Sequence, residues 1–372
     1  MNSKRTATLI LLLLSQLVMY GQSSKLWSVT STGGKHGLGT IFHLNSDGTE
    51  FTKVHDFDHN TGYPFASLSL ADNCLYGVTI GGEKAGNYGA VFKINTDGSE
   101  FEILHEFNGR NGAVPLGELI ESGGKLWGMT SEGGANGVGL VFNLSFDGKE
   151  FAVVHNFRKS DGANPRNALL KHDDKFWGVT SRGGKNNMGV IFTLHSDGTD
   201  YKKTYEFESS NGSEPESGIT LSNGKLWGIT TRGGVNNEGV IYSINFDGSE
   251  YTEHFDLAYP ALGDLIASSG KLWGMMALRG EQNCGTIFNF NDDGTNFQTI
   301  HNFDCTNGRF PEGNLLPSNG MLWGLTRFGG GFNYGVIFSL KEDGTGFKKV
   351  FDFNESSGGV PYSTLIEVPE TK

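Results

Sequence analysis

Cysteine, helical periodicity and positive charge are all scarce in this sequence of 372 residues. Only three cysteines are present, so a dense disulfide framework cannot hold the fold together. No window combines a sustained apolar repeat of helical period with capping residues, which argues against a helical protein. The formal net charge of −12 opposes nucleic acid or an anionic membrane surface as a partner.

Catalytic sequence motifs are also missing. The chain contains no Gly-x-Ser-x-Gly, no His-Glu-x-x-His and no phosphate-binding P-loop. Its Asp-Gly pairs lack the Asp-x-Asp-x-Asp-Gly core and the distant Glu of a calcium loop, and turn formation explains them. We therefore expect no metal and no cofactor. Whether the protein is an enzyme stays open, and a non-catalytic function is favoured.

Long apolar runs are confined to the N-terminus. Lys4 and Arg5 precede an apolar stretch over residues 7–18, and the small residues Gly21 and Ser23 follow it. The stretch is shorter than the about 20 residues that span a bilayer, and the pattern is typical of a signal peptide. We expect residues 1–23 to be cleaved on export, leaving residues 24–372 as one secreted, periplasmic or cell-surface domain with no membrane span. An uncleaved anchor is the alternative.

Glycine is abundant, with 56 residues, and a unit of about 50 residues is repeated seven times. Each unit contains Leu or Phe followed by an aromatic residue, then a Gly-Gly turn, a Gly-x-Val/Ile-aromatic run and an Asp-Gly turn. Runs rich in Val, Ile, Phe and Thr between Gly, Asn and Asp clusters are typical of β-strands. The leading aromatic residues are Trp27, Tyr76, Trp127, Trp177, Trp227, Trp273 and Trp323.

Seven units predict an all-β fold, a seven-bladed β-propeller of four-stranded blades. In the third unit we expect strands at residues 119–121, 125–130, 140–144 and 151–157. The first unit lacks a first strand, and residues 361–368 supply such a strand at the other end of the chain. We therefore expect the C-terminal strand to pair with the N-terminal blade and close the ring. An open β-solenoid is the alternative.

These signatures carry a family resemblance. Leu-Trp/Tyr-Gly-x-Thr, Gly-Gly, Gly-x-Ile/Val-Phe, Asp-Gly and Gly-x-x-Pro resemble the GloVer tandem repeats of exported bacterial "choice-of-anchor" proteins. The resemblance covers about residues 25–368 and all seven units. It implies an exported, propeller-like protein, and it implies no particular activity.

Two recurring aromatic positions have a structural interpretation. The Trp after Leu lies in mid-strand, so we expect it to fill the wedge between blades rather than to stack on sugar. Histidine recurs at a second position, where other units carry Tyr or Phe. A flat ring is therefore what that position requires, and we do not expect a shared metal site. The residues there are His55, His105, His155, Tyr205, Phe255, His301 and Phe351.

Two groups of residues could bind a ligand, although solvated side chains are the simpler interpretation of both. Arginines lie in or beside the loop between the second and third strands of units four to seven, where binding sites are common. We expect them on one rim, binding an anionic extracellular ligand such as an acidic polysaccharide. Carboxylates at the channel mouth are the alternative, as parts of a carbohydrate-active hydrolase or lyase. The residues are Arg182, Arg232, Arg279 and Arg327, and Glu118 and Asp264.

The cysteines give one disulfide candidate. Cys284 and Cys305 flank a hairpin that turns at Asp293-Gly294, although the simple register does not align them. Cys74 has no local partner, so we expect a free thiol. Together these observations predict an exported, monomeric binding or scaffold propeller, with an unknown polysaccharide or protein as its ligand.

Overall fold

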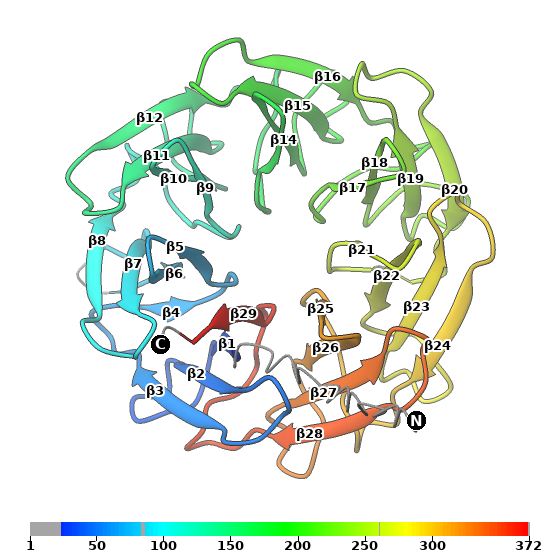
Figure 1. Cartoon of the computed structure of the whole chain (residues 1–372). Coiled ribbons are helices and arrows are strands. Elements are labelled where there is room, and N and C mark those ends of the chain that lie inside the picture. The colour runs from blue at the N-terminus through cyan, green and yellow to red at the C-terminus, as the bar shows by residue number, and fades with distance from the viewer. Residues whose placement is uncertain (1–23, 83–85, 260, 371–372) are drawn as a thin grey trace, which may run out of the picture.

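The computed structural model describes residues 24–82, 86–259 and 261–370. Seven antiparallel sheets surround a central channel, so the predicted all-β, seven-bladed propeller is confirmed (Figure 1). Within the described residues there is no helix long and apolar enough to cross a membrane. The expected signal peptide, residues 1–23, and Pro260 lie outside the described residues.

Six sheets have four strands, and the second has five because the short β4 also pairs with β6. In blades three to seven the innermost strand is the first of the unit, whereas in blade one β29 takes that place and in blade two β5 does, after the short β4. The blades are: β29 (Ile366–Pro369), β1 (Ser24–Thr30), β2 (Thr40–Asn45) and β3 (Thr52–Asp56); β4 (Tyr63–Pro64), β5 (Ser69–Ala71), β6 (Cys74–Ile80), β7 (Ala90–Asn95) and β8 (Glu102–Glu106); β9 (Ile120–Ser122), β10 (Lys125–Thr130), β11 (Leu140–Ser145) and β12 (Phe151–Asn156); β13 (Leu170–His172), β14 (Lys175–Thr180), β15 (Val190–His195) and β16 (Lys202–Glu206); β17 (Thr220–Ser222), β18 (Lys225–Ile229), β19 (Val240–Ile244) and β20 (Thr252–Asp256); β21 (Ile266–Ser268), β22 (Lys271–Met276), β23 (Thr286–Asn291) and β24 (Gln298–Asn302); β25 (Leu316–Ser318), β26 (Met321–Thr326), β27 (Val336–Lys341) and β28 (Lys348–Asp352).

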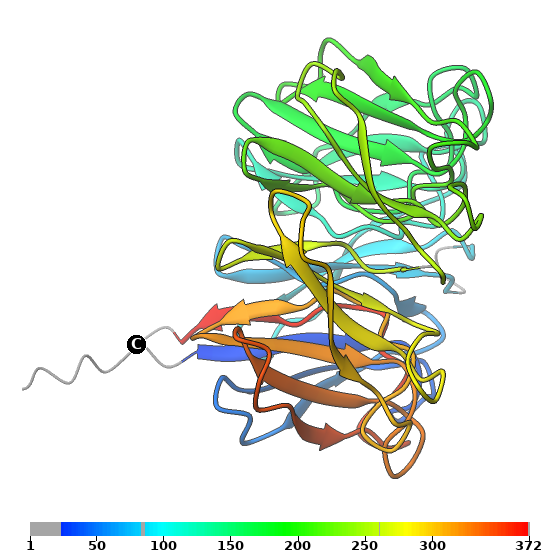
Figure 2. The ribbon, with the colours of Figure 1, turned by 90° about the vertical axis from the view of Figure 1, so that its right-hand side faces the viewer.

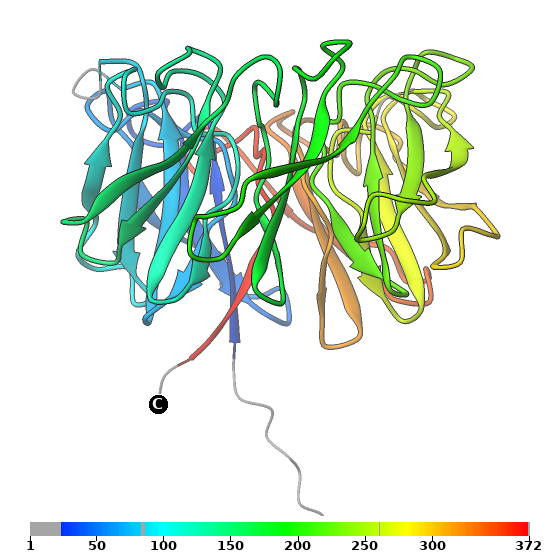
Figure 3. The same ribbon diagram turned by 90° about the horizontal axis from the view of Figure 1, so that it is seen from above.

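Strand register divides the loops between two faces of the ring. Lys25 pairs with Asn45 and Thr30 with Thr40, so the Gly-Gly loop lies at one end of the blade and the Asp-Gly turn at the other. Ser24 pairs with Pro369, which puts the start of β1 and the end of β29 on the Asp-Gly side. Figure 3 shows both strands reaching that side, opposite the longer loops. We call the side of the longer loops the Gly-Gly face.

The Asp-Gly turns have the geometry that their sequence predicts. Gly48 has a φ of +86°, in the left-handed region that favours glycine. The Asp47 carboxylate accepts hydrogen bonds from the Thr49 amide at 2.9 Å and from the Thr49 hydroxyl at 2.6 Å. Turn chemistry therefore accounts for both residues, as expected.

Tryptophan fills the space between blades, as predicted. Trp127 and Trp227 are buried, and their indole N–H groups donate to the backbone carbonyls of Ser122 and Ser222 at 3.1 and 3.3 Å. The indole N–H groups of Trp27, Trp273 and Trp323 have no hydrogen-bond partner among the described residues. These tryptophans therefore share their packing between blades, but only some of them donate a hydrogen bond to the backbone.

The outer strands carry a circle of aromatic contacts between neighbouring blades. His105 of β8 stacks on Phe151 of β12 at 3.8 Å between ring centroids, with an interplanar angle of 3°. The last blade meets the first in the same way, through Phe351 and Phe51 at 3.9 Å. The position therefore requires a flat ring, as expected. The full set of contacts is His55–Phe101, His105–Phe151, His155–Tyr201, Tyr205–Tyr251, Phe255–Phe297, His301–Phe347 and Phe351–Phe51.

The predicted closure is present. β29 pairs antiparallel with β1, from Trp27 opposite Ile366 to Ser24 opposite Pro369 (Figure 2). The predicted disulfide also forms: Cys284 is bonded to Cys305, with their Cα atoms 5.4 Å apart, and Cys74 is a free cysteine. A bulge between Ile287 and Phe288 shifts the register of that hairpin, which the simple count from the turn leaves out.

Candidate functional site

A short segment before the innermost strand of each blade forms the wall of the central channel. It begins at a proline, or at Ala261 in blade six, and ends at a buried Leu or Ile four residues later. Because side chains alternate along extended chain, the first and third residues after the proline share a face, and we call them channel positions one and three. Position one is Phe65, Leu116, Arg166, Glu216, Leu262, Glu312 and Tyr362; position three is Ser67, Glu118, Ala168, Gly218, Asp264, Asn314 and Thr364.

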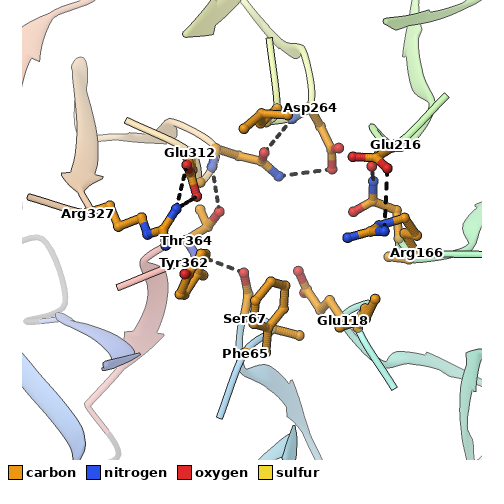
Figure 4. Close-up of a pocket in the computed structure, with 18 residues that line it drawn as sticks. Phe65, Ser67, Glu118, Arg166, Glu216, Asp264, Glu312, Arg327, Tyr362 and Thr364 are labelled. Atoms are coloured by element: carbon orange, nitrogen blue, oxygen red, sulfur yellow. Dashed lines mark hydrogen bonds and ion pairs between the residues drawn. The ribbon is translucent and has the colours of Figure 1, made fainter. Parts of the chain in front are cut away.

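These positions enclose a cavity of about 260 Å³. Apart from Arg327, its lining comes entirely from the channel segments. Figure 4 shows side chains converging on it from blades around the ring. We call it the channel cavity.

Side chains at position three link one blade to the next by a series of hydrogen bonds. The Ser67 hydroxyl accepts from the Thr364 amide at 2.9 Å, and the Thr364 hydroxyl accepts from the Asn314 amide at 2.8 Å. The Asn314 side chain accepts from the Asp264 amide at 2.6 Å, and Asp264 accepts from the Gly218 amide at 2.5 Å. Polar side chains at position three therefore form hydrogen bonds across four of the boundaries between neighbouring blades.

Glu118 stands at the same position but takes no part in this series. No hydrogen bond or ion pair reaches its carboxyl group from any described residue, and Figure 4 shows the group directed into the channel cavity. Burial and the nearby charge of Asp264 raise the pKa of Glu118 to about 8. Burial also raises the pKa of Asp264, although hydrogen bonds from Gly218 and Asn314 oppose that shift. The cavity thus holds a carboxyl group whose pKa is raised to about 8 and, from another blade, a second carboxyl group that is hydrogen-bonded.

The two arginines of the channel cavity are both paired. Arg327 donates to both oxygens of Glu312, at 3.0 and 3.3 Å, and Arg166 lies 3.4 Å from Glu216. The Arg327 guanidinium also lies over the Tyr362 ring, 4.3 Å from its centroid. Tyr362 in turn stacks on Phe65 at 4.6 Å, which adds an aromatic wall to one side of the cavity.

The four arginines predicted to form one basic rim occupy three different repeat positions. Arg182 and Arg232 are equivalent, since each forms the same backbone bridge to the preceding connection. In blade seven Phe328 forms that bridge, so Arg327 lies one residue earlier and, by alternation, on the opposite side. Arg279 lies one residue later, where the other blades have glycine. The four side chains are therefore not equivalent, although all four belong to loops on the Gly-Gly face.

The two equivalent arginines also differ in their contacts. Arg182 lies 3.2 Å from Glu214, which belongs to the connection into blade five. Arg182 is thus in an ion pair between blades. Anionic-ligand binding by the four arginines stays a prediction.

Sequence reasoning found Glu118 and Asp264 and missed the rest of the channel cavity. Stepping back two residues from Glu118 reaches position one, and the same step in other units reaches Arg166, Glu216 and Tyr362. Polar and aromatic residues with that period in a channel segment were the available signal. Among the residues that the structure describes, no cluster of three or more His, Cys, Asp or Glu residues is placed to hold a metal ion.

Several solved propellers resemble the chain in fold. A putative 6-phosphogluconolactonase from Bacteroides uniformis matches with a TM-score of 0.60 at 13% identity, covering 94% of this chain and 100% of that one. One from Bacteroides fragilis gives 0.59 at 14%, covering 93% and 98%. The periplasmic gluconolactonase of Pseudomonas aeruginosa gives 0.59 at 12%, covering 94% and 99%. At these identities the likeness concerns the fold alone.

Sequence comparison identifies the repeat itself. No curated protein matches the chain. The family model described as the Gloeobacter/Verrucomicrobia repeat matches residues 14–126, 81–259 and 250–371, which together span all seven blades. The chain therefore belongs to the Gloeobacter/Verrucomicrobia repeat family.

Proposed function

We propose that this protein is a binding propeller whose ligand site is the channel cavity, and that its ligand is a small polyhydroxylated molecule such as a sugar or the end of a glycan. The observation that carries the proposal is the cavity itself. About 260 Å³ of space is lined by a few placed polar side chains and one aromatic wall, and convergent polar groups in a concave space mark a candidate ligand site.

The lining suits hydroxyl groups, which both donate and accept hydrogen bonds. Asp264 and Glu118 supply carboxyl oxygens, and Arg166 supplies N–H donors. Phe65, stacked on Tyr362, offers apolar ring surface to the C–H groups of a sugar. Two of the similar propellers are named putative 6-phosphogluconolactonases and one a periplasmic gluconolactonase, and a sugar-derived ligand in this cavity agrees with those names.

The proposal includes export. The Cys284–Cys305 disulfide fits an oxidising compartment, because disulfides persist there and are rare in the cytosol. An exported binding protein with a closed ring and a small central site agrees with the absence of catalytic motifs. The oligomeric state and any protein partner stay predictions.

Filling the cavity tests the site. Ala168 occupies channel position three and lines the cavity, so Ala168→Phe should block the space without disturbing the hydrogen-bonded series. We expect saturation-transfer NMR to show monosaccharide binding to the wild type and its loss in Ala168→Phe. The matched control is Ala152→Phe, at an exposed position on the outer strand β12, which should bind like the wild type. Equal binding by both variants would contradict the channel site.

A second function is supported by one specific observation. Glu118, whose pKa is raised to about 8, lines the same cavity as Asp264, so it could act as a general acid with Asp264 as the second carboxyl group. Time-resolved NMR of the same sugars, together with gluconolactone and chromogenic glycosides, distinguishes the two functions. Turnover that Glu118→Gln abolishes would replace the binding proposal with a hydrolase.

A further inference from the structure

Charge in the channel cavity is unbalanced. Six charged side chains line it, and four of them form two ion pairs, Arg327 with Glu312 and Arg166 with Glu216. Glu118 and Asp264 remain without a cationic partner among the described residues. Two carboxyl groups in one cavity disfavour each other's ionised form, because like charges repel. A bound cation would relieve this repulsion, so the cavity favours a positively charged group.

Glu118 is the group that is free to bind such a charge. At four of the other channel positions three, a polar side chain accepts a backbone N–H from the neighbouring blade. The longer Glu118 side chain makes no such bond and extends into the cavity instead (Figure 4). The residue is half-buried in the channel wall, and no described residue hydrogen-bonds to either oxygen. An unpartnered carboxyl in these surroundings is costly unless it is protonated or paired.

Asp264 provides the second acceptor. One of its oxygens accepts the Gly218 amide, and the other accepts the Asn314 side-chain amide at 3.0 Å. Each carboxylate oxygen has two lone pairs, so both retain capacity for a further donor. A protonated primary amine has three N–H donors, which can be shared between Asp264 and Glu118.

We propose that Glu118 and Asp264 together bind the protonated amine of the ligand, so that the channel cavity selects an amino sugar over a neutral or acidic one. This inference rests on the proposed function and names its substrate class. An acidic sugar would meet the unpaired carboxyl groups, and both arginines that could receive it are already paired.

Amine binding displaces the proton that Glu118 holds. In the free protein at pH 7 this group is mostly protonated, since its pKa is about 8. A neighbouring ammonium favours the carboxylate and lowers that pKa, so binding releases about one proton. Affinity for the amine should therefore rise from pH 6 to pH 7, where the proton competes less for Glu118 and the amino group of the sugar is still mostly protonated. The other charged groups of the cavity, Arg166, Glu216, Glu312 and Arg327, are already ion-paired in the free protein.

Isothermal titration calorimetry with glucosamine, glucose, N-acetylglucosamine and glucuronate tests the inference. We expect glucosamine to bind at least about tenfold more tightly than glucose, with N-acetylglucosamine close to glucose and glucuronate weakest. Titrations in phosphate and in MOPS, which differ in ionisation enthalpy, should report the released proton. Glu118→Gln should remove both the preference and the proton release. Glu132→Gln, the same substitution at an exposed residue of the same blade, should keep both.

The possible failures are distinguishable with one further probe, ethanolamine. Equal affinity for glucose and glucosamine overturns the amine site and leaves the sugar site standing. Ethanolamine binding with proton release, while no sugar binds, supports the amine site and overturns the sugar proposal. Failure of all these probes to bind overturns both. A preference for glucosamine that survives in Glu118→Gln also contradicts the amine site.

Discussion

At the scale of single residues, Arg327 neutralises a carboxylate that the fold buries inside the channel. Glu312 retains only 12% of its side-chain exposure, and burial raises its pKa while the guanidinium of Arg327 lowers it. The same guanidinium lies over Tyr362 and so supports the aromatic wall of the cavity. One arginine therefore satisfies a buried acid and positions a ring.

Arg327→Met should destabilise the protein by about 2–3 kcal/mol at pH 7, because Glu312 would be left buried and unpaired. The loss should shrink at pH 5, since without Arg327 the pKa of Glu312 rises further and the carboxyl group takes up a proton. Urea denaturation at both pH values measures this. The control is Arg182→Met, whose partner Glu214 is part of a more exposed pair, and it should cost less than about 1 kcal/mol. Equal losses in the two variants would show that the channel pair has no special role.

Arg327 also shows where prediction from sequence stops. Its distance from the Gly-Gly pair resembles that of Arg182, yet a one-residue offset in a pleated chain reverses the side to which a side chain points. Glu118 and Asp264 were predictable because both sit one residue before a buried Leu in the repeat. That the carboxyl group of Glu118 lacks a partner was not predictable, because an unpaired carboxyl group is recognised only when the contacts of all neighbouring side chains are known.

At the scale of elements, ring contacts at the outer strands hold the blades together across each gap. Six of these contacts are stacked, and the Phe255–Phe297 contact is tilted. Where the ring is histidine, the contact depends on the neutral form. Burial lowers the pKa of His105 to about 4, and the Asn111 amide donates to its Nε2 at 3.0 Å, which requires an unprotonated nitrogen. The pKa values of His55, His155 and His301 are lowered as well, mainly by burial.

Stability should fall as the pH drops from about 6.5 toward 4. As the pH falls, a histidine whose pKa is lowered by folding takes up its proton in the unfolded state before it does so in the folded state. Its contribution to the free energy of unfolding is therefore complete above the ordinary histidine pKa and is lost as the pH approaches the lowered value. For His105 it amounts to roughly 1–2 kcal/mol once solvent screening is allowed for. His105→Phe keeps a flat ring and should lose less stability than the wild type between pH 7 and pH 4.5 in urea denaturation.

The exposed loop histidine provides the control for this measurement. His36→Phe should keep the pH dependence of the wild type, because His36 lies outside the stacks. A wild-type-like pH dependence in His105→Phe would place the acid sensitivity elsewhere. That these positions need flat rings was predictable from the exchange of His, Tyr and Phe between units. That the rings stack on the next blade was not, because the partner lies about 45 residues away and only the ring geometry brings it close.

At the scale of the whole molecule, one strand joins the two ends of the chain and three blades. β29 completes the sheet of blade one, where Lys25 pairs with Val368. Leu365 packs with Trp323 of blade seven, and Val368 packs in a cluster that extends to Leu75 of blade two. The split unit in the sequence made this closure predictable, because each end of the chain lacks what the other supplies.

Removing residues 361–372 should therefore open the ring. Deletion exposes the inner edge of β1 and the apolar surfaces that Leu365 and Val368 cover, so we expect a fall in melting temperature of roughly 10 °C or more, together with aggregation. A synthetic peptide of residues 359–372 should restore the melting temperature when added to the truncated protein. The same peptide with Leu365→Asp should not, because a charge would enter a fully buried position. If truncation leaves the melting curve unchanged, or both peptides act alike, β29 does not close the ring in solution.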